Sequence, residues 1–192
     1  MAARDIMKSK NGDSFASIDE FVVKMKSEDA NNLRIAKSMF IIYFVGIFIY
    51  GFFFVVSIVG GKGFWDGFSW FSILLAFVIF AYIFWLSKNI YRKVDYSLSV
   101  IEMLRQAKQR YRFWHPMVWL AILGFYLVDF GASISMTSDL ASSWTILERI
   151  GVANLFFTPV FFISLFFGWM RWKRRSKPIR DYAIEVLRDA EA

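Results

Sequence analysis

The 192 residues are 57% hydrophobic and 20% aromatic, with a mean hydropathy of +0.44, whereas soluble chains contain about 45–50% apolar residues. This composition excludes a disordered tail, a coiled-coil rod and an ordinary soluble enzyme. The net charge is +7, from 23 Lys and Arg against 16 Asp and Glu, and in so apolar a chain it indicates membrane topology before nucleic-acid binding. There is no cysteine and one histidine, so we expect no disulfide, no metal and no cofactor.

The first 38 residues are polar and contain one predicted amphipathic helix. Ser17 and Glu20 have the spacing of a capping box, in which each side chain satisfies a free backbone N–H of the first turn. Apolar residues then recur at helical spacing: Phe15, Ile18, Val22 and Met25. The segment is almost neutral, so anionic lipid has little attraction for it. We predict that this face binds a cytosolic partner protein; the alternatives are the inner membrane surface and mutual packing of the cytosolic helices.

Four apolar runs follow, over residues 39–59, 67–87, 116–138 and 150–170. Each is close to the 20 or so residues, at about 1.5 Å per residue, that a helix needs to cross a bilayer. Their apolarity is continuous and does not alternate, which favours helices over barrel strands. The predicted fold class is all-α: a polytopic membrane protein with four transmembrane helices in two hairpins, plus cytosolic amphipathic helices.

Basic residues set the predicted orientation. Residues 1–38, 88–115 and 171–192 each hold seven Lys and Arg, and the two short loops between hairpin helices hold one each. Because basic residues accumulate on the cytoplasmic side, both termini and the central segment are predicted to be cytoplasmic. Basic residues beside the spans are also candidates for binding lipid headgroups. They are Arg92, Lys93, Arg171, Lys173, Arg174 and Arg175.

Two further cytosolic helices are predicted. Ser99 and Glu102 repeat the capping-box spacing in the central basic segment, residues 88–115, and Pro178 suits the first turn of a short helix in the tail, residues 171–192. The expected apolar face of the central helix is Ile101, Leu104, Lys108 through its stem, Tyr111 and Trp114.

A shift of 83 residues aligns the chain with itself. It places residues 67–87 on 150–170, and residues 101–107 on 184–190, where five of seven residues are identical. One interpretation is a parallel internal repeat, each unit being a hairpin, a basic collar and an amphipathic helix. The other is that a cytosolic helix after a membrane hairpin is simply a common arrangement.

Asp129 is the one ionisable residue inside a predicted span, and such residues are costly to bury and often functional. Asn154 and Thr158 share a face of the next span at similar depth. The three residues are a candidate intramembrane polar site, either a proton or cation site or an interhelical hydrogen bond.

Small residues recur on another face of the third span: Ala121, Gly124, Gly131 and Ser135. They permit close helix packing, within the bundle or between protomers of a homo-oligomer.

Two segments resemble a group of uncharacterised small four-span bacterial inner-membrane proteins. One runs from Val94-Asp95-Tyr96-Ser97-Leu98 through Ile101-Glu102-Met103-Leu104 to Ala107-Lys108-Gln109-Arg110-Tyr111-Arg112. The other contains Lys24-Met25-Lys26, Glu28-Asp29 and Asn32-Leu33. The resemblance covers essentially the whole chain, and it implies the bacterial inner membrane and a regulatory role. It carries no catalytic or binding residue onto this sequence.

The function predicted from the sequence is non-enzymatic: an integral membrane protein that tethers or regulates a cytosolic partner through its cytosolic helices. The alternative is an oligomeric small channel or ion-coupled transporter subunit that uses Asp129. No catalytic constellation supports an enzyme. The expected partners are membrane lipids, a cytosolic protein and further copies of the chain, and not nucleic acid.

Overall fold

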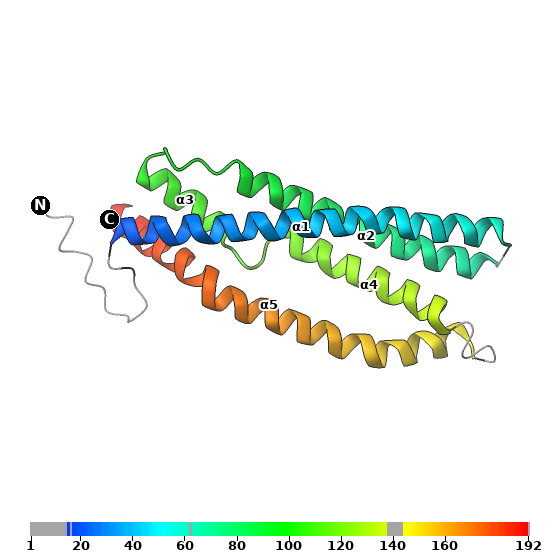
Figure 1. The fold of residues 1–192 in the computed structure, drawn as a ribbon. Helices are drawn as coiled ribbons and strands as arrows, with labels where there is room; N and C mark the ends of the chain where they lie inside the picture. Colours follow the sequence, from blue (N-terminus) through cyan, green and yellow to red (C-terminus); the bar gives the residue numbers. More distant parts are fainter. Residues whose placement is uncertain (1–14, 16, 62, 138–143, 192) are drawn as a thin grey trace, which may run out of the picture. The chain divides into compact units, whose positions relative to one another are not determined.

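The structure, a computed structural model, describes residues 15, 17–61, 63–137 and 144–191, which form five helices (Figure 1). These are α1 (Ile18–Val59), α2 (Phe64–Arg92), α3 (Val100–Arg110), α4 (Pro116–Thr137) and α5 (Ile146–Glu191). No strand occurs within those ranges, which confirms the all-α fold class.

Four helices, α1, α2, α4 and α5, are long and apolar enough to cross a membrane. They contain the predicted runs 39–59, 67–87 and 150–170, and residues 116–137 of the third run, and the chain is a multi-pass membrane protein. Large apolar side chains such as Phe48, Phe52, Leu155 and Phe156 are exposed along α1 and α5. Such exposure is stable where lipid tails, rather than water, surround a helix.

Three of the helices, α1, α2 and α5, extend beyond the predicted spans, and two of them extend far into the polar segments. Helix α1 joins the N-terminal amphipathic helix to the first span without a break, and α5 joins the fourth span to the tail. The predicted helix start near Pro178 is therefore wrong. A proline inside a helix removes one backbone hydrogen bond, but packing fixes the chain on both sides of it. Before it, Trp172 Nε1 donates to the Tyr111 carbonyl oxygen at 2.9 Å, and after it Ile179 is fully buried.

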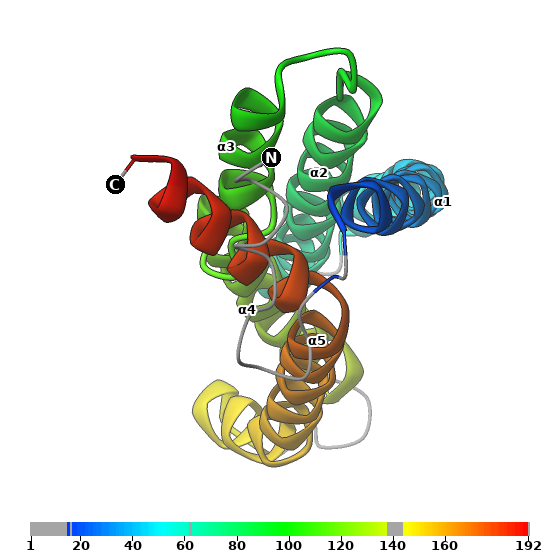
Figure 2. The ribbon, with the colours of Figure 1, turned by 90° about the vertical axis from the view of Figure 1, so that its left-hand side faces the viewer.

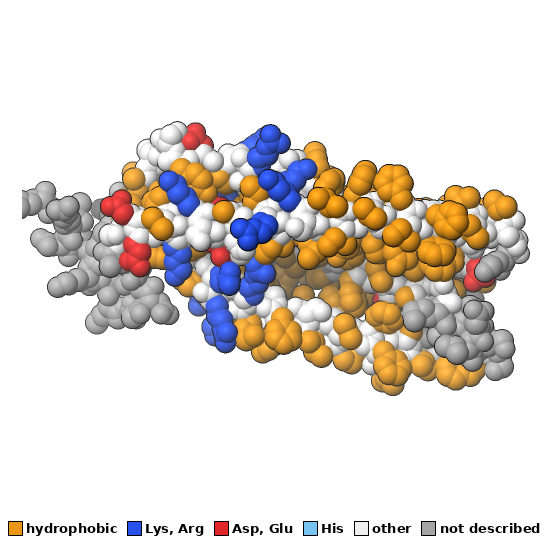
Figure 3. All heavy atoms as spheres, in the orientation of Figure 1, with side chains coloured by type: hydrophobic (Ala, Val, Ile, Leu, Met, Phe, Trp, Pro, Cys, Tyr) orange, Lys and Arg blue, Asp and Glu red, His pale blue; other side chains and the backbone are white. Residues whose placement is uncertain are grey.

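The chain divides into two compact units. We call residues 1–34, 90–114 and 166–192 the basic unit, and residues 35–89 and 115–165 the apolar unit. The basic unit contains 19 of the 23 Lys and Arg. In the space-filling view, lysine and arginine side chains gather on the basic unit and apolar side chains cover the apolar unit (Figure 3).

In the apolar unit, α1 packs on α2 and α4 packs on α5 (Figure 2). The Tyr43 ring of α1 stacks on Phe84 of α2 at 5.5 Å, and Phe125 of α4 lies 4.5 Å from Phe161 of α5. Helices α2 and α4 meet at Gly131, where a Cβ atom would lie 2.5 Å from the carbonyl oxygen of Ser69. The prediction that small residues allow close packing of the third span is confirmed at this position.

Candidate functional site

The amphipathic part of α1 begins as predicted. Glu20 N donates to Ser17 Oγ at 3.2 Å, so the serine caps the first turn. The predicted partner-binding face, however, is not free. Phe15 and Met25 are buried, and Ile18 and Val22 are half-buried. The prediction that this face is open for a partner is wrong, because the face packs against other segments of the same chain.

That face belongs to the hydrophobic core of the basic unit. Phe21, which is 0% exposed, contacts the rings of Phe15, at 5.4 Å, and Tyr182, at 4.8 Å, and those two rings also contact each other at 5.1 Å. The residues of the core come from Phe15 and α1, from α3 and its C-cap Tyr111, and from the last part of α5. The buried residues are Phe15, Phe21, Met25, Met103, Leu104, Ala107, Tyr111, Ile179, Tyr182, Ala183 and Leu187. Of the three alternatives for the cytosolic helices, the structure shows mutual packing.

Helix α3 begins at the predicted cap, with Glu102 N donating to Ser99 Oγ at 3.4 Å. Its buried face differs from the prediction, because Ile101 and Trp114 are exposed whereas Met103 and Ala107 are buried. Leu104 and Tyr111 are buried as expected. The helix is rotated so that the short Ala107 side chain faces the core and the charged Lys108 faces outward.

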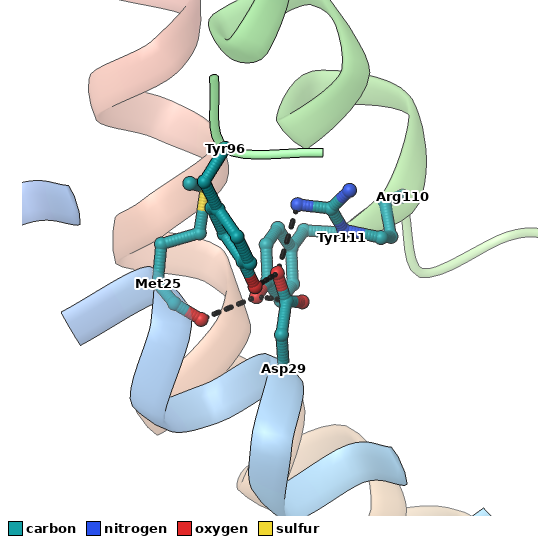
Figure 4. A network of polar contacts seen from close by, with 5 residues as sticks. All are labelled: Met25, Asp29, Tyr96, Arg110 and Tyr111. Carbon is teal, nitrogen blue, oxygen red and sulfur yellow. Dashed lines mark hydrogen bonds and ion pairs between the residues drawn. The ribbon is translucent and has the colours of Figure 1, made fainter. Parts of the chain in front are cut away.

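A buried polar network lies at the edge of this core (Figure 4). Asp29 of α1 is 2% exposed and its carboxylate accepts three hydrogen bonds. Oδ2 accepts from Arg110 Nη2 and from the Tyr96 hydroxyl, both at 2.9 Å, and Oδ1 accepts from the Tyr111 hydroxyl at 2.6 Å. The Arg110 side chain is itself only 7% exposed, so this is a buried, charge-assisted ion pair.

Burial raises the pKa of the Tyr96 and Tyr111 hydroxyls above their ordinary value, and the neighbouring Asp29 carboxylate raises it further. Both phenols therefore remain protonated at neutral pH and act as donors toward the carboxylate. The Tyr111 hydroxyl also lies 3.4 Å from the Met25 carbonyl oxygen, next to the core.

Local structure positions the two tyrosines. Tyr96 lies in the connection between α2 and α3, where Ser97 N donates to Asp95 Oδ1 at 2.8 Å and forms a tight Asx turn. Tyr111 is the C-cap of α3, and its backbone N–H closes the last turn on the Ala107 carbonyl oxygen. The network thus joins α1, the connection after α2, and the end of α3.

The sequence reasoning missed this network. Asp29 is one of several acidic residues in a nearly neutral segment, and nothing in the spacing indicates a cation 81 positions away. The two segments on which the family resemblance rests contain Asp29, Tyr96, Arg110 and Tyr111, and this is the one sequence signal that marks them.

Among the described contacts, no hydrogen bond joins the three residues of the predicted intramembrane site to one another. Asp129 is 4% exposed in the apolar unit, and its own carbonyl oxygen and Oδ1 accept from Ser133 Oγ, one turn along α4. Asn154 donates to the Ile150 carbonyl oxygen of its own helix, and Thr158 is exposed. Asp129 and Asn154 thus bond within their own helices, and the three-residue site stays a prediction.

The candidate lipid-binding residues lie in different settings. Arg92 and Lys93 are exposed where α2 ends, and Arg171 is exposed on α5. Arg175 Nη1 lies 3.7 Å from Glu28 Oε2, in an ion pair between α5 and α1. Lys173 and Arg174 line a pocket together with Lys24.

Comparisons with known proteins find no match among protein-family models, curated proteins or solved structures. Within the described residues, no group of three or more His, Asp or Glu side chains lies together as a metal site would require. The basic unit is a folded module with a packed core and a buried carboxylate that accepts three hydrogen bonds.

Proposed function

We propose that this chain is a multi-pass protein of the bacterial inner membrane with both termini and the basic unit in the cytosol. The distribution of basic residues supports this orientation, because 21 of the 23 Lys and Arg fall in residues 1–38, 88–115 and 171–192. The family resemblance supports the bacterial membrane.

The protein acts without catalysis and holds a cytosolic partner at the membrane or regulates it there. The observation that supports this function best is that all three polar segments fold into one module. Residues that serve only as topology determinants need no apolar core and no buried ion pair, whereas a module presented to a partner needs a rigid surface. The absence of cysteine rules out a thiol nucleophile, and the single histidine removes most arrangements with a histidine base.

The partner surface lies on the outside of the module, because the face of α1 predicted from the sequence is buried. Each of the three helices keeps a large apolar residue exposed: Val23 on α1, Ile101 on α3 and Ile184 on α5. Exposed apolar residues of this kind lose their contact with water when a partner protein covers them, and they are the positions at which the proposed contact can be tested. Helix α3 adds Arg105 and Lys108 at helical spacing from Ile101, which favours an acidic partner.

The test replaces the exposed apolar residues of this surface. A deletion of the N-terminal segment would be less specific, because it would also remove Phe21, Met25 and Asp29 from the module. The full chain and the variant Val23→Ser, Ile101→Ser, Ile184→Ser would be purified from native membranes in mild detergent, and co-purifying proteins measured by quantitative mass spectrometry. Val59→Ser with Leu147→Ser, at exposed positions of the apolar unit, is the matched control. We expect one soluble protein with the full chain and the control, reduced about tenfold or more with the surface variant.

Recovery of the same soluble proteins with all three forms, or of none with any, would contradict the tethering function.

The alternative function is an ion-coupled transporter or channel subunit, and the burial of Asp129 in the apolar unit is the observation that favours it. A relay needs further titratable groups, and Asp129 is bonded only to Ser133 of its own helix among the contacts the structure describes. We therefore expect Asp129→Asn and the unmodified protein to give equal proton and cation flux in liposomes. A lower flux from Asp129→Asn at equal protein amount would favour the alternative.

A further inference from the structure

Three basic side chains from two helices line a pocket in the basic unit. Its volume is about 540 Å³, and it is lined by Lys24, Trp169, Met170, Lys173, Arg174 and Pro178. Lys24 comes from α1 and the others from α5. No acidic side chain is among the lining residues, so the pocket concentrates positive charge.

Several other basic groups of the unit are neutralised by ion pairs. Arg110 pairs with Asp29, Arg175 with Glu28, and Lys177 and Arg180 with Asp181. In the described part of the chain, none of Lys24, Lys173 and Arg174 has a carboxylate within ion-pair distance. Three cations without an ion pair among the described contacts therefore converge on one pocket, which favours the binding of a phosphate group.

Aromatic rings hold two of these cations in place. The Lys24 Nζ lies 4.8 Å from the centroid of the Phe15 ring, and the Lys173 Nζ lies 5.1 Å from that of Trp169. Phe15 is buried in the core of the basic unit, so Lys24 is anchored to a fixed part of the structure. Anchoring lowers the conformational entropy that the lysines would lose on binding an anion.

One wall of the pocket is apolar and continues along α5. Trp169 and Met170 line the pocket, and the Trp169 ring contacts Phe166 at 6.3 Å. Phe166 and Phe167 are both more than half exposed. A soluble anion gains nothing from this strip, whereas a lipid would place its phosphate among the three cations and its acyl chains along the phenylalanines.

We propose that this pocket binds the headgroup of an anionic phospholipid from the leaflet beside the basic unit. Lys24, Lys173 and Arg174 hold the phosphate, and Trp169 packs against the glycerol region, where an amphipathic ring is best solvated. The proposal depends on membrane insertion and not on the tethering function, since it concerns a different surface of the unit.

The test uses the full chain, delipidated in neutral detergent and titrated with phosphatidylglycerol or phosphatidylcholine, with bound lipid counted by native mass spectrometry. The variant Lys24→Gln, Lys173→Gln, Arg174→Gln removes the pocket charges. The control Lys26→Gln, Arg34→Gln, Arg112→Gln removes three exposed charges of the same unit outside the pocket. We expect phosphatidylglycerol to bind about tenfold or more weakly to the pocket variant and nearly unchanged to the control.

Equal losses in the two variants would overturn the proposal, since the basic residues would then act only as a diffuse collar. So would displacement of phosphatidylglycerol by millimolar inorganic phosphate, which would make the pocket a site for soluble anions, or equal binding of phosphatidylcholine. If the triple variant loses its helical circular dichroism, Lys24→Gln alone, at an exposed position, must still weaken phosphatidylglycerol binding more than Lys26→Gln does.

Discussion

Asp29→Ala is expected to destabilise the basic unit by about 3–5 kcal/mol, the usual cost of removing one partner from a buried ion pair. The substitution leaves the Arg110 guanidinium buried without a carboxylate, and it takes away the acceptor of the Tyr96 and Tyr111 hydroxyls. Unfolding of the module in detergent, followed by hydrogen exchange at the α3 amides, would measure the loss. The helices of the apolar unit should keep their protection, because none of their residues contributes to the network.

Glu28→Ala is the matched control, since it removes the adjacent acid of α1. Glu28 pairs with Arg175 at 3.7 Å, and the arginine side chain is 57% exposed. The Glu28 side chain is only 11% exposed, but its partner reaches solvent, which screens the pair, so the control should cost only about 0–1 kcal/mol. In the double variant Asp29→Ala, Arg110→Met the orphaned charge is gone, and much of the stability should return. Equal effects of Asp29→Ala and Glu28→Ala would show that the network contributes little to the fold.

The membrane part of the fold could be predicted because each helix can be recognised from its own residues. A run of about 20 apolar residues has few alternatives to a spanning helix, whatever the rest of the chain does. The same holds for the helix starts after Ser17 and Ser99, since a capping box depends on residues three positions apart. Gly131 also fits, because only a small residue permits the approach of Ser69.

The basic unit was harder to predict because its stability comes from contacts between distant segments. An apolar face such as Phe15, Ile18, Val22 and Met25 is the same in sequence whether it meets a partner, lipid or the chain's own helices. The same limit applies to the break expected at Pro178. Local rules favour ending the helix there, but the packing of Trp172 and Ile179 keeps it continuous.

The aligned segments of the suggested repeat have related environments in the basic unit. Leu104 and Leu187 are equivalent in the alignment and are both buried in its core, whereas Ile101 and Ile184 are equivalent and both exposed. The segments differ in their connections. Helix α2 ends at Arg92 and α3 begins at Val100, while α5 continues through the corresponding region. The connection in the first half provides Tyr96 to the buried network, which the continuous α5 does not reproduce.

Phe21→Ala should also destabilise the basic unit by about 3–5 kcal/mol, because it removes a fully buried ring and leaves a cavity. Phe21 lies between the sequence-predicted residues Ile18 and Val22 and is more deeply buried than either. Its ring contacts both Phe15 and Tyr182, so its loss loosens the contact between the start of α1 and the end of α5. Thermal unfolding of the purified protein, monitored by near-ultraviolet circular dichroism, would detect the change.

Val23→Ala is the control for this substitution, since Val23 is two residues further along α1 and 67% exposed. It removes apolar surface without opening a cavity. The free energy of unfolding should therefore change by no more than about 0.5 kcal/mol, as is typical of surface substitutions. The pair also separates folding from function. If the protein tethers a partner, Val23→Ala lowers the amount of partner recovered while the module remains folded. Phe21→Ala lowers that amount only in proportion to the fraction of the module that is unfolded. If a fully folded Phe21→Ala protein no longer recovered the partner, then the face of α1 that packs in the core would itself have to open and bind the partner.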